Sequence, residues 1–207
     1  LMAERLISSA QIQTGPKQTI FAAVRFGNVM GSRGSVIPLF RWQIQTRKQI
    51  TITDSQMSRF MMTLKQATAL TIEAMKRAHG GEVFVLKMPV IKLGDLADAL
   101  INETSKEIGI NPSSVERIEI GLRPGEKIYE ELMTNDEAAH ALELPDMFII
   151  PNSFVEEKVR YGGAVPSLNG SYNSHEVEPI GYDEIVEMIR AQRLTETDSR
   201  SDGGMSI

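Results

Sequence analysis

The stretch that decides the fold is Thr19-Ile20-Phe21-Ala22-Ala23-Val24-Arg25-Phe26-Gly27-Asn28-Val29-Met30-Gly31-Ser32-Arg33-Gly34-Ser35. Residues 19–26 form a mostly apolar run of the length typical of a strand buried on both faces. A glycine-rich loop follows over residues 27–35, and residues 36–46 predict a short amphipathic helix. A buried strand that leads through glycines into a helix indicates a parallel α/β sheet.

The same alternation continues along the chain. Further strands are expected over residues 50–53, 82–87, 115–120 and 148–150. Helices are expected over residues 1–14, 64–79, 93–108, 127–132 and 182–194, and the polar residues 195–207 are expected to be disordered. This pattern predicts an α/β fold with a doubly wound, Rossmann-like parallel sheet. Only about two of its strands are evident, whereas such a sheet usually has about five or six, so we expect that this chain carries only part of it.

Apolar residues recur at helical spacing from the first residue of the sequence. Leu1, Met2, Leu6 and Ile7 recur at helical spacing, and no Ser, Thr, Asp or Asn precedes them to cap a helix. We therefore expect the sequence to start inside a helix of a larger protein. The alternative is a frayed helix at an artificial boundary.

The composition excludes several classes of protein. The 207 residues include 22 Lys and Arg, 27 Asp and Glu and no Cys, which gives a formal net charge of −5. An acidic chain is unsuited to the phosphate backbone of nucleic acids, and without Cys no disulfide or thiolate metal site can form. No apolar stretch approaches the roughly 20 residues of a membrane span, and no signal peptide is visible. We expect a soluble, cytoplasmic protein.

The glycine-rich loop has two interpretations. It lies between a strand and a helix, and Asp54 follows it by about 20 residues, as in a dinucleotide-binding fingerprint. Its spacing, Gly27-x₃-Gly31-x₂-Gly34, differs from that fingerprint. The glycines expose backbone N–H groups, and Arg33 and Ser35 add donors beside a helix N-terminus, which favours binding of an anion. A tight turn with solvated polar residues is the alternative.

Three arginines indicate what the anion is. Arg33, Arg59 and Arg123 each lie beside a turn or a strand end rather than on a helix face. Arg123 begins Arg-Pro-Gly-Glu, in which Pro124 and Gly125 predict a turn that directs Arg123 and Glu126 to a common side. A guanidinium suits a diphosphate and a carboxylate suits a pair of ribose hydroxyls, so the pattern favours a nucleotide diphosphate. Taken singly, each arginine is more often part of a surface ion pair.

No catalytic set of side chains is evident. His79, His140 and His175 have no carboxylate partner at a useful spacing. Glu130-Glu131 is expected to be the solvated face of a helix, and Tyr129 is expected to pack. Without Cys or a cluster of His and carboxylates, no metal site is expected.

Three blocks of sequence together resemble a known family. They are Val24 to Pro38, which contains the glycine-rich loop, Met57-Ser58-Arg59-Phe60, and Arg123-Pro124-Gly125-Glu126-Lys127-Ile128-Tyr129-Glu130-Glu131-Leu132. In order and spacing they are similar to the extended short-chain dehydrogenase/reductases of the polysaccharide-biosynthesis (CapD-like) group, in particular to the inverting UDP-N-acetylglucosamine 4,6-dehydratases. The resemblance covers about residues 1–150. The extension over residues 151–207, partly helical with a disordered tail, resembles nothing that we can assign.

The resemblance implies a lyase that uses bound NAD or NADP. In the family, hydride leaves C4 of the sugar, water is lost across C5 and C6, and the hydride returns at C6. The glycine-rich cofactor loop and the Tyr-x-x-x-Lys pair of the family are absent from these 207 residues, and the family's lysine would fall just before Leu1. The chain is therefore similar to the C-terminal, substrate-binding half of such an enzyme, and alone it is expected to be inactive.

The resemblance also assigns roles to residues. Asn28 would hydrogen-bond the diphospho-sugar, with Arg33 and Ser35 beside it. Thr53 would contact the nucleotide end, Arg59 and Arg123 the diphosphate, and Glu126 the ribose. The backbone near Phe26 and Gly27 would face the nicotinamide. Ser58 and Phe26 stand where many relatives have Thr and Tyr, which bears on specificity rather than on family membership.

Other functions remain open at this point. A nucleotide-sugar 4-epimerase of the same superfamily shares the binding residues and expels no water. A non-catalytic nucleotide-sugar binding module is a rival of another class. The implied partner is a UDP-sugar, with no nucleic acid and no membrane span, and a full-length protein of this family would be a homo-oligomer.

Overall fold

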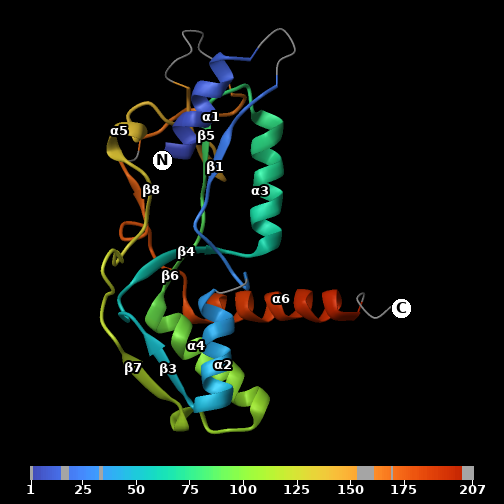
Figure 1. The fold of residues 1–207 in the computed structure, drawn as a ribbon, viewed down its shortest axis with the longest axis vertical. Coiled ribbons are helices and arrows are strands. Elements are labelled where there is room, and N and C mark those ends of the chain that lie inside the picture. The colour runs from blue at the N-terminus through green and yellow to red at the C-terminus, as the bar shows by residue number, and fades with distance from the viewer. Residues whose placement is uncertain (1, 15–18, 33–34, 153–160, 169, 202–207) are drawn as a thin grey trace. The chain divides into compact units, whose positions relative to one another are not determined.

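The computed structural model describes residues 2–14, 19–32, 35–152, 161–168 and 170–201 (Figure 1). The chain divides into two compact units, each assembled from three segments. The first comprises Leu1–Gly27, Lys65–Met88 and Glu131–Glu176, and the second comprises Asn28–Leu64, Pro89–Glu130 and Val177–Ile207. The sequence-based boundary at residue 150 falls inside the first unit.

The first unit is built on a five-stranded sheet of order β1-β5-β10-β9-β11. Its strands are β1 (Ala23–Arg25), β5 (Val83–Leu86), β10 (Met147–Ile150), β9 (Leu142–Glu143) and β11 (Val165–Pro166). β1 and β5 are parallel, with Val24 opposite Phe84, and β10 runs antiparallel to β5. Every residue of β5 is buried. The predicted α/β class is confirmed, and the sheet is mixed because β10 returns beside β5. The prediction for β1 is wrong in detail: it covers only three residues of the strand predicted over 19–26, and these are half-buried rather than buried on both faces.

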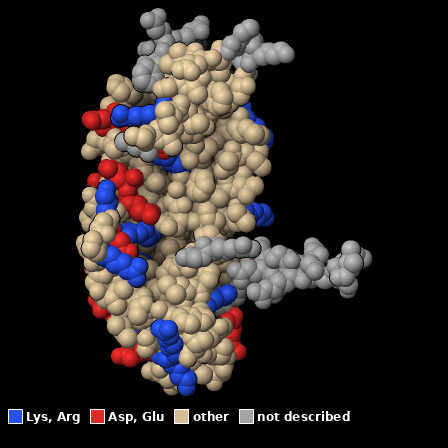
Figure 2. Space-filling view, viewed as in Figure 1, with Lys and Arg blue, Asp and Glu red and all other residues tan. Residues whose placement is uncertain are grey.

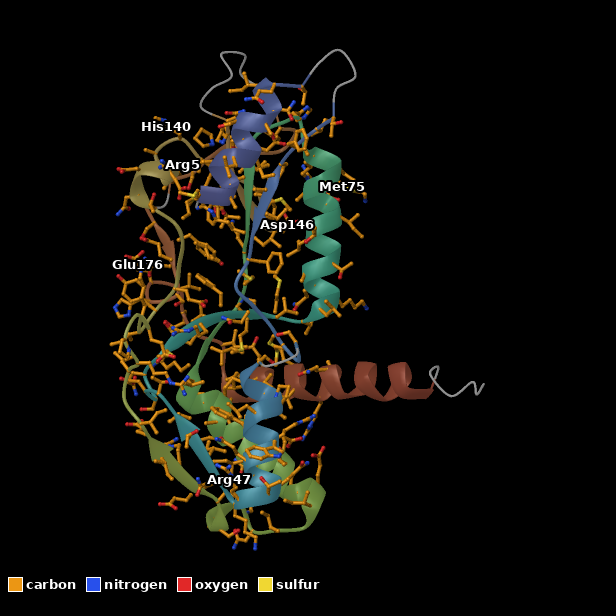
Figure 3. All side chains as sticks on the ribbon, in the orientation of Figure 1. Arg5, Arg47, Met75, His140, Asp146 and Glu176 are labelled. Atoms are coloured by element: carbon orange, nitrogen blue, oxygen red, sulfur yellow. The ribbon has the colours of Figure 1, made fainter. Side chains whose placement is uncertain are left out.

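The helices of the first unit bury few side chains. They are α1 (Met2–Ile12), α3 (Leu64–Arg77) and the short α5 (Asn135–Ala138). Figure 1 shows α3 running alongside β1 and β5, yet only Ala67 and Ala74 of α3 are buried. Met75, labelled on α3 in Figure 3, has 68% of its surface exposed. Polar contacts therefore matter for holding these helices in place.

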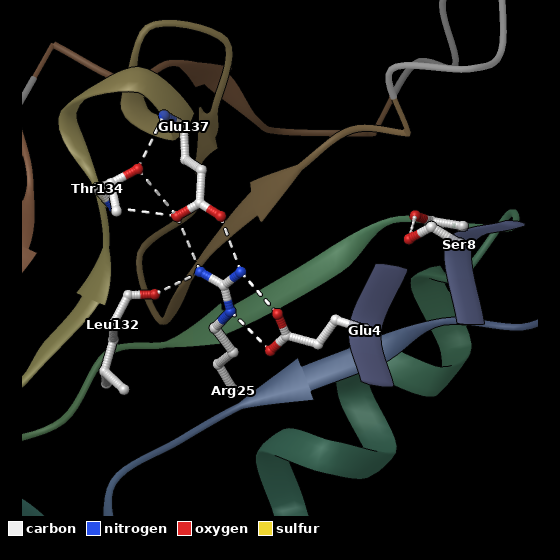
Figure 4. Close-up of polar contacts among 7 residues, drawn as sticks. Glu4, Ser8, Arg25, Leu132, Thr134 and Glu137 are labelled. Carbon is white, nitrogen blue, oxygen red and sulfur yellow. Dashed lines mark hydrogen bonds and ion pairs between the residues drawn. The ribbon is translucent and has the colours of Figure 1, made fainter. Parts of the chain in front are cut away.

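Arg25 is the centre of the main polar network of this unit. Its Nε and Nη2 donate to the two carboxylate oxygens of Glu4 on α1, both at 2.8 Å. Its Nη1 and Nη2 also donate to Glu137 at 2.9 and 2.8 Å, and Nη1 donates to the Leu132 carbonyl at 2.9 Å (Figure 4). Thr134 caps α5 through a capping box with Glu137. One guanidinium thus joins α1, β1 and the segment that carries α5.

The predicted helix over residues 127–132 is wrong. The chain there is irregular, with a bend at residues 128–129, and it leads into β8 (Glu131–Met133), which pairs with β12 (Tyr172–Asn173). The physical reason lies in the carbonyl of Ile128, which accepts the N–H of Ser58 at 2.9 Å. This bond draws the backbone against a neighbouring strand and takes it out of the local pattern that a helix requires.

The second unit places helices against two small sheets. β3 (Gln49–Ile52) pairs in parallel with β7 (Glu116–Glu119), and β4 (Ser58–Met62) lies between β2 (Asn28–Val29) and β6 (Val90–Lys92). The helices are α2 (Val36–Arg47), α4 (Leu93–Ile108) and α6 (Tyr182–Ser201), with a 3₁₀ turn, η1, at Pro112–Ser114. Figure 1 shows α2 and α4 side by side next to β3. The helices predicted over residues 36–46 and 93–108 are confirmed.

One continuous core fills this unit. Fully buried side chains come from α2, from α4 and from α6, namely Ile37, Phe40, Ile44, Leu96, Leu100, Ile185 and Ile189. α6 continues beyond residue 194 to Ser201, so its predicted end is too early, while residues 202–207 of the expected disordered tail lie outside the described residues.

The described surface is mixed in charge. On the face shown in Figure 2, acidic and basic side chains lie among one another, and the described residues form no broad basic area. None of the helices in the described part of the chain combines the length and the apolar character needed to span a bilayer.

Candidate functional site

A cavity of about 390 Å³ opens within the second unit. Its volume falls in the range of small-molecule binding sites. It is bordered by the residues after β2, the N-terminus of α2, the end of β3, β4 and the Arg-Pro-Gly-Glu turn. Six of the seven residues predicted to bind substrate line it, which are Asn28, Ser35, Thr53, Arg59, Arg123 and Glu126. The seventh, Arg33, lies outside the described residues.

The N-terminus of α2 contributes unpaired donors to the cavity. Ser35 stands at the N-cap position with extended backbone (φ −73°, ψ 166°), but its side chain makes no capping hydrogen bond. Its hydroxyl is buried and has no partner among the described residues. Val36 and Ile37 occupy the first turn, where N–H groups have no partner within the helix, and both line the cavity. This end of α2 is therefore suited to an anion.

Asn28 is held by two acceptors. Its Nδ2 donates to the carbonyl of Phe60 at 3.1 Å and to the carboxylate of Glu130 at 3.0 and 3.3 Å. The same carboxylate accepts the backbone N–H of Phe60 at 3.1 Å. Glu130 was predicted to be the solvated face of a helix, which is wrong: it is 29% exposed and anchors Asn28 to β4.

Arg59 also points its guanidinium at the 127–130 segment. Nη2 donates to the carbonyl of Lys127 at 2.7 Å, and Nη1 donates to those of Ile128 and Ser58 at 3.2 and 2.7 Å. Nε lies 3.7 Å from Glu130. Most of its donors are therefore occupied by backbone carbonyls, and Arg59 fixes the segment that leads away from the Arg-Pro-Gly-Glu turn.

The Arg-Pro-Gly-Glu turn forms as predicted. The N–H of Glu126 donates to the carbonyl of Arg123 at 3.0 Å, and Gly125 has φ +87°, which the third position of a type II turn requires. The backbone N–H of Arg123 donates to the Glu126 carboxylate at 3.0 Å. Both side chains line the cavity, and the guanidinium of Arg123 has no partner among the described residues. It is the cation available to a bound anion.

Apart from Thr51, the rest of the cavity wall is apolar. It is formed by Val29, Met30, Ile37, Leu39, Phe40, Ile52, Met57, Met61, Leu93 and Ile120. Leu39 and Ile120 keep nearly half of their surface exposed, at 46% and 49%. An apolar wall beside a few placed polar groups is the usual composition of a site for a ring-containing ligand.

Glu130 is the residue of this site that sequence reasoning missed. Its position in the third sequence block, close to Arg123 and Glu126, was a usable signal. The helical interpretation of the block concealed it, because a helix would have turned the side chain to solvent.

The remaining predicted residues belong to the first unit. Phe26 and Gly27 follow β1, Phe26 is 40% exposed, and the N–H of Gly27 donates to the sulfur of Met88 at 3.3 Å. The three histidines are also in the first unit, with His140 labelled in Figure 3, and none of them lines the cavity.

The chain matches proteins of known families. The family model described as polysaccharide biosynthesis protein matches residues 1–152. The X-ray structure of Pen from Bacillus thuringiensis is 54% identical, with a TM-score of 0.83, and the match covers 93% of this chain and 56% of that one.

Two curated relatives differ in their named activities. The UDP-glucose 4-epimerase of Rickettsia massiliae is 36% identical over 200 residues, 91% of this chain and 54% of the relative. The inverting UDP-N-acetylglucosamine 4,6-dehydratase of Campylobacter jejuni subsp. jejuni serotype O:2 is 36% identical over 154 residues, 74% of this chain and 43% of the relative. The chain thus spans about half the length of these relatives.

The resemblance drawn from the three sequence blocks is confirmed, since all three lie within the matched residues. The chain belongs to the polysaccharide biosynthesis protein family, within the extended short-chain dehydrogenase/reductases.

Proposed function

We propose that the chain is the substrate-binding part of a UDP-N-acetylglucosamine 4,6-dehydratase-like enzyme of surface polysaccharide biosynthesis. The observation that carries this proposal is the presence of two available donors in one cavity. The hydroxyl of Ser35 at the N-terminus of α2 is buried and has no partner among the described residues, and the exposed guanidinium of Arg123 lines the same cavity. A diphosphate satisfies both at once, because it accepts several charged hydrogen bonds.

The other lining residues are assigned to different parts of the ligand. We assign Glu126 to the ribose hydroxyls and Thr53 to the nucleotide end, while the apolar wall receives the rings. Arg59 was expected to bind the diphosphate. Because its guanidinium donates to three backbone carbonyls, we assign it to holding the 127–130 segment in place. Arg33 remains a predicted diphosphate ligand.

A cofactor is part of the proposal. NAD or NADP, when bound, accepts a hydride from the sugar carbon and returns it. The exposed ring of Phe26 and the carbonyl groups after β1 lie at the carboxyl end of a parallel strand, which is where open α/β sheets bind such ligands. Phe26 and Gly27 can contact a nicotinamide, but two residues cannot by themselves hold a dinucleotide.

The isolated chain should bind without turning over. The 207 residues contain no Tyr-x-x-x-Lys pair to move protons at the sugar. Incubation with UDP-N-acetylglucosamine and NAD is expected to give no 4-keto product, while calorimetric titration with UDP detects binding. Detection of a 4-keto sugar contradicts the assignment of this chain as a binding part alone, and the absence of UDP binding contradicts the assignment of the cavity.

A nucleotide-sugar 4-epimerase is the second candidate. The observation in its favour is that the epimerase relative matches 91% of this chain, including residues beyond the 152 that the family model matches. The two reactions can be distinguished by measuring the product mass of an enzyme that contains these residues together with a cofactor-binding half. The product of a dehydratase is lighter than the substrate by one water, whereas the product of an epimerase has an unchanged mass.

A UDP-sugar as ligand, a homo-oligomer in the full-length protein and a cytoplasmic location stay predictions. A non-catalytic nucleotide-sugar binding module would bind UDP equally well. The two interpretations are separated by an assay of an enzyme that joins these residues to a cofactor-binding half: product is expected under the proposal, and no product is expected if the chain is a regulatory module.

A further inference from the structure

The side-chain amide of Asn28 is held in one orientation by groups that can only accept. Its two neighbours are the carbonyl of Phe60, at 3.1 Å, and the carboxylate of Glu130, at 3.0 Å. A carbonyl and a carboxylate are both hydrogen-bond acceptors, so the amide atom that faces them is the nitrogen. This resolves the usual ambiguity between the two ends of an asparagine amide.

The oxygen of this amide is therefore the end left for a ligand. Asn28 lines the cavity and is exposed, and all of its side-chain hydrogen bonds to described residues are made by Nδ2. A carbonyl oxygen accepts hydrogen bonds and is repelled by phosphoryl oxygens, which also only accept. The group that meets Asn28 must be a donor.

We propose that Glu130 positions Asn28 as a hydrogen-bond acceptor that selects a hydroxyl or amide N–H on the sugar, and that Asn28 makes no bond to the diphosphate. The proposal rests on the proposed function, since it takes a nucleotide sugar as the ligand. It assigns specificity for the sugar to Asn28 and recognition of the diphosphate to other residues of the cavity.

The charge of Glu130 is essential to this arrangement. Its two oxygens serve two N–H groups, from Asn28 and from the backbone of Phe60, and Arg59 Nε lies 3.7 Å away. A glutamine has the same shape but offers only one oxygen and one N–H₂ group. The two donors would then have to share one neutral oxygen, because Oε2 is the atom that both Asn28 Nδ2 and the Phe60 N–H can reach, and the hold on the Asn28 amide would weaken.

Affinity measurements on the 207-residue chain test the assignment. Titrations with UDP and with UDP-N-acetylglucosamine compare the original chain with Asn28→Ala, Glu130→Gln and the control Glu131→Gln. Glu131 is the adjacent residue, it is exposed, and its replacement makes the same change of charge. Both site variants are expected to lower the affinity for the sugar nucleotide about tenfold and to leave that for UDP within about twofold, as loss of one hydrogen bond to the sugar predicts. The control is expected to change neither.

Sugar analogues test whether Asn28 accepts a hydrogen bond from the sugar, and they leave the protein unchanged, so folding is not affected. UDP-sugars in which one donor at a time is replaced by fluorine, which does not donate, are titrated against the original chain and Asn28→Ala. One position is expected to lose about tenfold in the original chain and nothing further in the variant. If no position behaves in this way, or if Asn28→Ala weakens UDP as much as the sugar nucleotide, the proposal is overturned.

A spectroscopic readout separates positioning from general damage. The side-chain N–H₂ signals of Asn28, assigned by their loss in Asn28→Ala, are expected to show hydrogen bonding in the free protein and to shift in Glu130→Gln but not in Glu131→Gln. Unshifted signals in Glu130→Gln overturn the role of Glu130. Failure to bind either UDP or sugar nucleotides overturns the proposed function along with this inference, whereas binding with equal losses for both ligands overturns the inference alone.

Discussion

Arg25 and Glu137 meet through two parallel hydrogen bonds, from Nη1 to Oε2 at 2.9 Å and from Nη2 to Oε1 at 2.8 Å. The same guanidinium binds Glu4 on its other side (Figure 4). The hydrogen bond from Arg25 lowers the pKa of Glu4. Burial acts to raise the pKa of Glu137, but the bonds from Arg25 and Thr134 outweigh it, so this pKa also lies below its ordinary value.

Replacement of Arg25 by Gln should destabilise the first unit. It leaves two partly buried carboxylates without their partner, and since they retain about a fifth of their exposure (21% and 22%), we expect a loss of about 2–3 kcal/mol in the free energy of unfolding, less than for a fully buried pair. Urea denaturation measures it. Arg5→Gln, an exposed arginine of α1 labelled in Figure 3, is the control. Equal stability of the two variants would show that the network contributes nothing.

The pair formed by Glu103 of α4 and Arg190 of α6 predicts a pH dependence. The hydrogen bond from Arg190 lowers the pKa of Glu103 to about 2. A lowered carboxyl pKa stabilises the fold above the unfolded-state value of about 4.3 and loses this effect as the pH falls through the folded-state value. Glu103→Gln should therefore lower Tm by about 2–4 °C near neutral pH, and the difference should shrink as the pH falls from about 4.5 toward 2.

The control for this pH dependence is Glu187→Gln, an exposed acidic residue of α6. A Tm difference for Glu103→Gln that is constant with pH would exclude an ionic origin for the contribution of Glu103.

Two N-cap residues of this protein should respond in opposite ways to truncation. Thr134 makes a real capping bond, so Thr134→Ala should cost about 1 kcal/mol in stability. Ser35 makes none, so Ser35→Ala should leave stability nearly unchanged. It should instead weaken UDP binding about three- to tenfold, because the ligand loses a donor. Thermal unfolding and titration separate the two effects. A Ser35→Ala variant with a lowered Tm and an unchanged affinity for UDP would mean that Ser35 stabilises α2 rather than binding the ligand.

Arg123→Gln should weaken UDP binding by about tenfold or more, since a charged hydrogen bond to a phosphate is lost. The affinity that remains should depend less on salt concentration. Arg47→Gln removes the same charge from the far end of α2, where Arg47 stacks on Trp42, and it should leave UDP affinity unaltered. Equal losses in both variants would point to general electrostatics rather than to a contact.

The elements with long and regular patterns were predictable from sequence. β5 and α4 bury most of their residues, so apolar runs and helical periodicity reveal them directly. β4 was not recognised because its residues, Ser58 to Met62, neither alternate nor form a purely apolar run. It is a strand because β2 and β6 pair with it on both sides, and no local pattern encodes such a partner.

The candidate site was predictable in its residues but not in its connections. Asn28, Ser35 and Arg123 were recognised from the loop and the turn, whose glycines and proline have local causes. The contacts of Glu130 with Asn28 and Phe60 span 102 and 70 positions of sequence. Neither spacing nor propensity reports on a contact of that range, so the positioning residue became visible only in the structure.

The glycine-rich loop also lies against a helix that is distant in sequence, since Gly31 is next to the side chain of Gln192 on α6. Gly31 has φ +77°, and a β-carbon placed there would lie only 1.6 Å from Nε2 of Gln192 on α6. The positive φ favours glycine here whatever the ligand, while the amide of Gln192 is the end of a flexible side chain and can move away from an added β-carbon. Substitutions at residue 192 that enlarge or remove its side chain therefore change the packing around Gly31 without replacing any residue that is proposed to bind the ligand.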